Sequence, residues 1–167
     1  MLRTSPPGRT RYLGLLAAGI GTLIAGPAHA QGRSLASIDV CALVPSSEIV
    51  AGLAAHDAGP PRDISRPGAR ACRYHYSIGS ERHTPEIAIV KPADYEAARK
   101  RVPEGLMREF RGLGDVAFAA QTDEGLVLYA LRRNDVAVRV TLKGRIDDAD
   151  DLLHARALAR RALEALR

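Results

Sequence analysis

Histidine is the residue type in this sequence with the widest range of chemistry, because imidazole ligates metals and transfers protons near neutral pH. The chain has five: His29, His56, His75, His83 and His154. His75 and His83 flank a short turn and could approach each other. A zinc site, however, needs three or four converging ligands, and no H-x-H or H-E-x-x-H spacing occurs here. The sequence therefore predicts no metal site and no cofactor.

Other residue patterns that carry chemistry favour structural roles. No serine lies in a G-x-S-x-G setting. The acidic group at 147–151 lacks the glycine and the alternating oxygen ligands of a calcium loop, and it suits a helix cap. Gly112-Leu113-Gly114-Asp115 precedes a strand, whereas a phosphate cradle leads into a helix. A catalytic pair of carboxylates is not singled out, so we predict no catalytic residue.

The two cysteines, Cys41 and Cys72, could form a disulfide, a redox pair or part of a metal site. Redox pairs usually stand at C-x-x-C spacing, and two thiols alone do not complete a zinc site. An even count in an exported chain is typical of a structural disulfide. We therefore expect a Cys41–Cys72 bridge that closes a loop of about 30 residues and contributes roughly 3–4 kcal/mol.

Arginines recur through a proline-rich stretch and could form a basic patch for an anionic partner, such as lipid headgroups or a cell-wall polymer. The residues of this patch are Arg62, Arg66, Arg70, Arg73 and His75. Ordinary solvated arginines are the alternative interpretation.

The first 30 residues have the three parts of a secretory signal peptide. Three arginines come first, residues 12–26 are apolar, and Ala28 and Ala30 supply the small residues that a signal peptidase reads. We expect cleavage between Ala30 and Gln31 and a periplasmic or secreted mature chain. An uncleaved anchor is the alternative, but the apolar run is shorter than the ~20 residues that span a bilayer.

Cleavage would change the charge of the chain. Three of the 24 Lys and Arg residues leave with the signal peptide, and all 19 Asp and Glu residues stay, so 21 − 19 leaves a net charge of +2. Nucleic-acid binding needs a concentrated basic surface, and the sequence therefore disfavours a nucleic-acid partner.

The periodicity of the chain after residue 44 predicts one α+β domain. We expect residues 31–44 to be a loose leader and residues 45–167 to be a single disulfide-stapled domain. Its five strands, in the order αββαβββα, should form a mainly antiparallel sheet. The predicted helices cover residues 45–55, 92–102 and 147–167, and the predicted strands cover residues 72–77, 86–90, 116–121, 126–133 and 136–142.

Strand alternation also predicts which side chains face the core. Tyr74 and Tyr76 should point inward with Cys72, and Arg73 and His75 should point outward. A two-residue hairpin at Asn134–Asp135 should join the last two strands. The stripe along the last helix should be Leu152, Ala155, Ala159, Leu163 and Leu166.

Three short stretches resemble small exported bacterial envelope proteins of unknown function, many of which are lipoproteins. The stretches are Cys41-Ala42-Leu43-Val44-Pro45 before a helix, Cys72 and Tyr74 in a strand, and Gly112-Leu113-Gly114-Asp115 ahead of a strand. The resemblance implies a helix that is tied to a cysteine-starting strand. It implies no activity, and this chain lacks the lipid-bearing cysteine.

The sequence favours a non-catalytic binding module of the cell envelope. Its partner would be another envelope protein or an anionic envelope polymer, with no nucleic acid and no stable membrane insertion of the mature chain. A small envelope hydrolase, with a site assembled from dispersed acids and histidines, is the alternative.

Overall fold

The computed structural model describes residues 35–133, 135–145 and 147–167, which belong to one compact unit. The expected signal peptide and its cleavage site lie outside the described residues. None of the described helices is long and apolar enough to cross a membrane.

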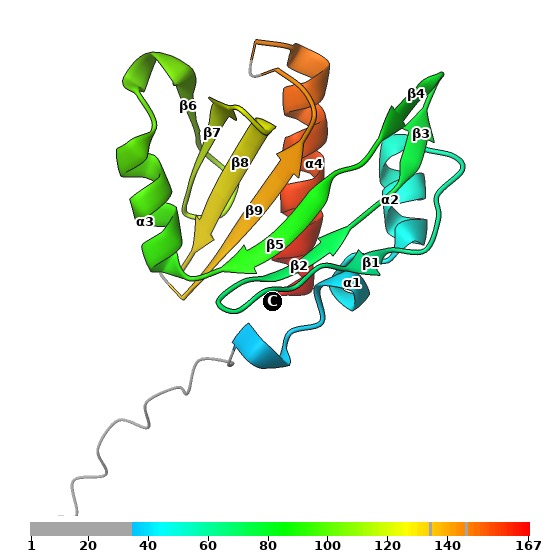
Figure 1. Ribbon diagram of the computed structural model, residues 1–167, viewed down its shortest axis with the longest axis horizontal. Coiled ribbons are helices and arrows are strands. Elements are labelled where there is room, and N and C mark those ends of the chain that lie inside the picture. The colour runs from blue at the N-terminus through cyan, green and yellow to red at the C-terminus, as the bar shows by residue number, and fades with distance from the viewer. Residues whose placement is uncertain (1–34, 134, 146) are drawn as a thin grey trace, which may run out of the picture. The chain divides into compact units, whose positions relative to one another are not determined.

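Four α-helices and two short 3-10 helices are present in the described chain (Figure 1). They are η1 Leu35–Ser37, α1 Val40–Leu43, α2 Ser46–Leu53, α3 Pro92–Arg101, η2 Glu104–Leu106 and α4 Ala149–Ala165. The predicted helices at 45–55, 92–102 and 147–167 correspond to α2, α3 and α4. The short helix α1 falls within the segment that was expected to be a leader, and its Val40 is buried.

The strands confirm the α+β class but not the predicted number of strands. They are β1 Arg62–Asp63, β2 Arg70–Arg73, β3 Tyr76–Ile78, β4 Glu81–His83, β5 Glu86–Val90, β6 Met107–Phe110, β7 Val116–Thr122, β8 Gly125–Arg132 and β9 Val136–Leu142. Seven of them form one antiparallel sheet in the order β1-β2-β5-β9-β8-β7-β6, and β3 and β4 form a separate two-stranded sheet. The prediction of five strands was therefore wrong.

The additional strands have local causes. β1 has only two residues, both exposed and set among prolines, and β6 is a four-residue strand at the opposite edge. The predicted strand 72–77 is divided, because the ladder of β2 with β5 stops where Pro85 lacks an N–H group. A hydrogen bond from the Tyr74 N–H to the Pro85 carbonyl, 3.0 Å long, bridges this interruption.

β8 ends one residue earlier than predicted, because its last residue is Arg132, which pairs with Val136. Asn134 of the predicted two-residue hairpin lies outside the described residues. Arg133 has a positive φ of 50°, and its N–H donates to the Asp115 carboxylate, which holds the turn against the neighbouring loop.

The two faces of the sheet are covered unequally. On one face, α4 packs the predicted stripe of apolar residues against strands β5, β8 and β9, and this stripe is confirmed. On the other face, α3 contacts β8 and β9, and its Tyr95 packs edge-on against Phe118. Figure 1 shows α3 beside one half of this face, while β2 and β5 extend beyond it. The other half of this face, over β2 and β5, is the open half.

The inward residues of the predicted first strand are confirmed. Cys72, Tyr74 and Tyr76 are at most 1% exposed, whereas Arg73 is half-buried and His75 is exposed. This alternation places Arg73 on the open face of the sheet.

Candidate functional site

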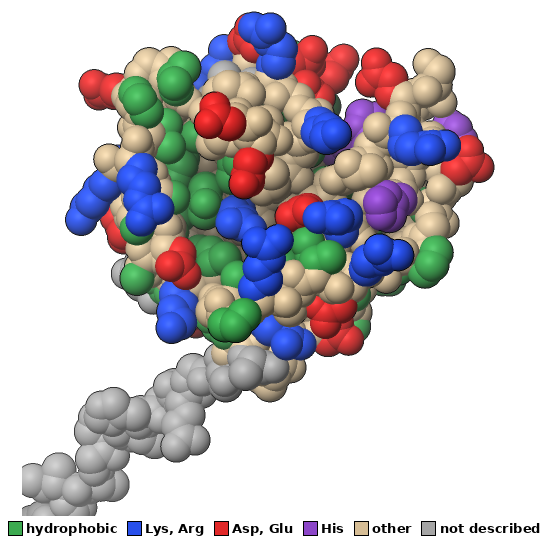
Figure 2. Space-filling view, viewed as in Figure 1, with side chains coloured by type: hydrophobic (Ala, Val, Ile, Leu, Met, Phe, Trp, Pro, Cys, Tyr) green, Lys and Arg blue, Asp and Glu red, His purple; other side chains and the backbone are tan. Residues whose placement is uncertain are grey.

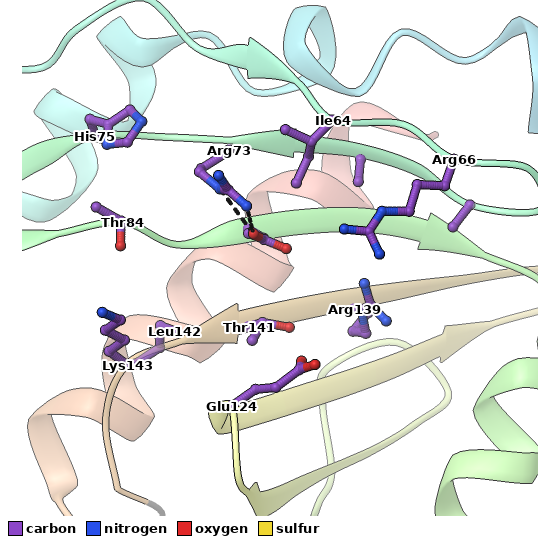
Figure 3. Close-up of a pocket in the computed structure, with 13 residues that line it drawn as sticks. Ile64, Arg66, Arg73, His75, Thr84, Glu124, Arg139, Thr141, Leu142 and Lys143 are labelled. Carbon is purple, nitrogen blue, oxygen red and sulfur yellow. Dashed lines mark hydrogen bonds and ion pairs between the residues drawn. The ribbon is translucent and has the colours of Figure 1, made fainter.

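A cavity of about 630 Å³ lies on the open half of the sheet, over β2, β5 and β9 (Figure 3). Its sides come from the loop after β1 and from residues next to the ends of β7 and β9. In Figure 2, Lys and Arg side chains gather near the centre of this face. The residues that line the cavity are Ile64, Arg66, Ala69, Ala71, Arg73, His75, Thr84, Glu86, Glu124, Arg139, Thr141, Leu142 and Lys143.

Arg139 stands on the central strand β9, where a charged residue is unusual between buried neighbours. Its partner on β5 is Ala88 and its partner on β8 is Tyr129, and Ala71 pairs with Ala88 one strand further out. Since paired residues share a face of the sheet, two alanines lie in a row beside Arg139. Their small side chains leave the space that the guanidinium enters.

The Nε atom of Arg139 is buried and has no hydrogen-bond partner among the described residues. Buried N–H groups are nearly always paired, because leaving one unpaired costs about 1–3 kcal/mol. The Arg139 Nε–H group is therefore a donor without an acceptor among the described residues, at the base of the side chain that lines the cavity.

Arg66 reaches the same cavity from a tight turn. The Arg66 N–H donates to the Ala69 carbonyl (2.9 Å), and the Ala69 N–H donates back to the Arg66 carbonyl (3.0 Å). Pro67 and Gly68 form the centre of this turn, with a φ of 86° at Gly68, and proline followed by glycine is the residue pair that a type II turn prefers. In Figure 3 the side chains of Arg66 and Arg139 point toward one another.

Ser65 fixes the loop that carries Arg66. Its N–H donates to the Asp63 carboxylate at 2.8 Å, and its hydroxyl accepts from the Ala71 N–H at 3.0 Å. The hydrogen bonds from Ser65 hold the pKa of Asp63 below its ordinary value. The loop before Arg66 is therefore tied to β2.

Arg73 and Glu86 form an ion pair beside the free arginines. The Nε and Nη2 atoms of Arg73 donate to one carboxylate oxygen of Glu86, at 2.9 and 2.6 Å. The two residues are cross-strand partners on β2 and β5, and Thr141 on β9 continues their row. The charge of Arg73 is therefore already neutralised within the protein.

Two further charges complete the cavity. Lys143 and Glu124 are exposed at its rim, and neither forms an ion pair with another described residue. With Arg73 paired to Glu86, the free charges are Arg66, Arg139 and Lys143 against Glu124. The cavity therefore has a positive balance.

The structure brings together three of the five residues of the predicted basic patch. Arg66, Arg73 and His75 line the cavity, whereas Arg62 is exposed on the edge strand β1. Arg70 points to the other face of the sheet, where its Nε donates to the Ile38 carbonyl at 3.2 Å.

Sequence reasoning missed Arg139 and Lys143. The signal for Arg139 was present, because one arginine interrupts the run of valines and alanines in the strand 136–142. That Arg139 lies beside Arg66 could not be read from the chain, because it depends on β5 pairing with both β2 and β9.

The predicted disulfide is present, with the Cα atoms of Cys41 and Cys72 5.2 Å apart. It ties α1 to β2, and Cys72 faces the side of the sheet that α4 covers. Since neighbouring residues of a strand face opposite sides, the bridge and the cavity use opposite faces of β2.

The histidines do not converge as a metal site, and no group of three or more His, Cys, Asp or Glu residues able to hold a metal occurs in the described chain. His83 lies near Tyr76 and His154, with ring centroids 5.8 and 5.0 Å away, and His154 shares a hydrogen bond with the Tyr76 hydroxyl. Burial, and then the nearby His83, lower the pKa of His154 to about 4. His75, in contrast, lines the cavity.

The other two motifs have structural roles, as predicted. Asp148 caps α4 by accepting from the N–H groups of Asp150 and Asp151. In the glycine turn, Gly114 has a φ of 65° and packs closely on the Leu131 backbone.

No protein-family model, curated protein or solved structure matches this chain. The geometry of the cavity is therefore the feature that points to a function.

Proposed function

We propose that this protein is an exported, non-catalytic binding module of the cell envelope that holds an anionic ligand on the open half of its sheet. The observation that carries the proposal is the pair Arg66 and Arg139. Both side chains line one cavity and point toward one another, and neither has an acidic partner among the described residues (Figure 3).

Two facing guanidinium groups repel each other, and the repulsion grows where water is displaced. Neither guanidinium has a carboxylate within ion-pair distance among the described residues to offset this repulsion. An anion between the two groups would relieve this repulsion. The planar fork of donors on arginine suits carboxylate and phosphate oxygens.

The groups of the cavity support binding rather than reaction. One carboxylate oxygen of Glu86 already accepts two hydrogen bonds from Arg73. The lining residues include no serine or cysteine, which are the commonest nucleophiles of hydrolases. The tyrosine–histidine cluster lies elsewhere, between β3, β4 and α4.

Export of the chain is supported by the sequence of residues 1–30 and by the resemblance to envelope proteins. The Cys41–Cys72 bridge is compatible with export, because disulfides persist in oxidising compartments.

Titration of the protein with sodium benzoate tests the anion site. The Nε–H signal of Arg139 in a nitrogen–proton NMR spectrum should shift with saturation, and calorimetry should give the affinity. Arg139→Gln should weaken binding about 10- to 100-fold, the range for loss of a charged hydrogen bond. Arg66→Gln, on a surface loop, should act in the same direction without endangering the fold.

Arg82→Gln is the matched control, because Arg82 is exposed on β4 and lies outside the cavity. It should bind benzoate like the unmodified protein. Equal binding by Arg139→Gln and Arg82→Gln, or no response of the Arg139 signal to benzoate or phosphate, would contradict the proposal.

A further inference from the structure

From the same cavity we infer the class of ligand: a small organic anion with one acid group and an apolar body. This inference rests on the proposed anion site and goes beyond it, since it disfavours both inorganic oxyanions and anionic polymers as the main ligand.

The distribution of charge favours a single acid group. Arg73 is occupied by Glu86, so the free cations number three, and only Arg66 and Arg139 face each other. Glu86 and Glu124 also line the cavity. Glu86 is neutralised by Arg73, but a polymer with closely spaced negative charges would meet the free carboxylate of Glu124 and would be repelled by it.

The size of the cavity favours a ligand larger than an inorganic oxyanion. Its volume of about 630 Å³ falls within the ~300–1,000 Å³ that is typical of small-molecule sites. One carboxylate or phosphate group between the two arginines would leave most of this space unfilled.

One side of the cavity offers apolar contact within a lining that is otherwise mostly polar. Ile64, Ala69 and Ala71 line the cavity, and all three belong to the apolar cluster on this face of the sheet. Ile64 and Ala69 are only partly buried, so part of their surface is free to contact a ligand.

The same loop supplies both kinds of contact. Ile64 and Arg66 are two residues apart, and the Ile64 N–H is bonded to the Ala71 carbonyl at 3.0 Å. An apolar wall and a guanidinium are therefore fixed next to each other. This arrangement fits a molecule with an acid group at one end and hydrocarbon at the other.

A series of straight-chain carboxylates tests the inference. Butyrate, hexanoate and octanoate should displace benzoate, with affinity rising roughly two- to fourfold for each added methylene, the gain expected when a methylene leaves water. Phosphate should bind no better than butyrate. Heparin should displace benzoate only weakly at an ionic strength at which octanoate still binds.

Ile64→Thr keeps a β-branched side chain, shortens it by one heavy atom and makes the apolar wall polar. It should flatten the dependence on chain length while butyrate binding stays close to normal. Val116→Thr is the control, because Val116 is exposed on β7 outside the cavity and should leave the series unchanged. Thermal unfolding of each variant should show an intact fold.

Different outcomes overturn the two proposals separately. If benzoate and phosphate bind through Arg139 but affinity does not rise from butyrate to octanoate, the ligand class is wrong and the anion site stands. Tight binding of heparin that Arg139→Gln weakens would also refute the ligand class alone. If none of these anions perturbs the Arg139 signal, the proposed function itself fails.

Discussion

His154 shows how a single buried side chain makes stability depend on pH. It is 7% exposed, and its ring contacts Tyr76 and His83. Burial first, and then His83, disfavour the imidazolium form, whereas Asp151 favours it less strongly, and the pKa falls from 6.5 to about 4. The unfolded chain therefore binds a proton that the folded chain excludes.

The free energy of unfolding should consequently fall as pH falls from about 6.5 toward 4, by an amount on the order of 3 kcal/mol from this residue. The stabilisation is complete above pH 6.5 and is lost below pH 4. Urea unfolding between pH 4 and pH 8 measures it. His154→Gln should be less stable at pH 8 and should lack this part of the slope.

Exposed carboxylates also titrate in acid, so the difference between the two proteins is the informative quantity. Parallel curves for His154→Gln and the unmodified protein would show that His154 does not control the acid sensitivity.

At the scale of an element, the glycine turn at residues 112–115 needs glycine for two different reasons, backbone conformation and close packing. Gly112 and Gly114 both have positive φ, 76° and 65°, but only Gly114 is crowded. A Cβ at Gly114 would overlap the Leu131 carbonyl oxygen, which accepts a 2.8 Å hydrogen bond from the Asp115 N–H. Nothing lies within 4 Å of a Cβ at Gly112.

Alanine substitutions should therefore separate backbone strain from collision. Gly112→Ala should lower stability by about 1 kcal/mol, the cost of a left-handed residue. Gly114→Ala should cost roughly 2–4 kcal/mol, because the turn must also move away from β8. Chemical denaturation measures both, and equal costs would rule out the collision.

The Cys41–Cys72 disulfide also stabilises the fold at the scale of elements, because it joins α1 to β2. Cys41→Ala and Cys72→Ala should each lower the free energy of unfolding by about 3–4 kcal/mol, because either opens the same loop. The double variant should be no worse than the single ones. An unchanged melting temperature, or strongly unequal single variants, would contradict a purely structural bridge.

At the scale of the whole molecule, sequence periodicity predicted most of the elements. β5 and β9 were predicted with their observed ends, because apolar and β-branched residues mark both runs. β1 and β6 were not predicted. Both are short edge strands with little apolar periodicity in the sequence, and they are recognised as strands by their pairing with β2 and β7. The division between β2 and β3 depends on Pro85, which directly precedes β5, the strand that pairs with β2.

The candidate site was less predictable than the fold. Arg66 and Arg73 were found because they are close in the sequence. Arg139 comes from a strand 66 residues after Arg73, and its position depends on the strand order of the sheet. Arg70 was predicted to belong to the same patch because it is close in the sequence. Strand alternation, however, turns its side chain to the other face of the sheet, toward Ile38.

The two arginines of the cavity stand on elements of different rigidity, and this difference bears on how the protein could diversify. Arg139 is fixed in the centre of the sheet, whereas Arg66 is carried by a Pro67–Gly68 turn at the surface. Loops tolerate substitution and insertion better than core strands. Related proteins could therefore acquire new ligand preferences by changing this turn alone, while the strand arginine and the stapled core are retained.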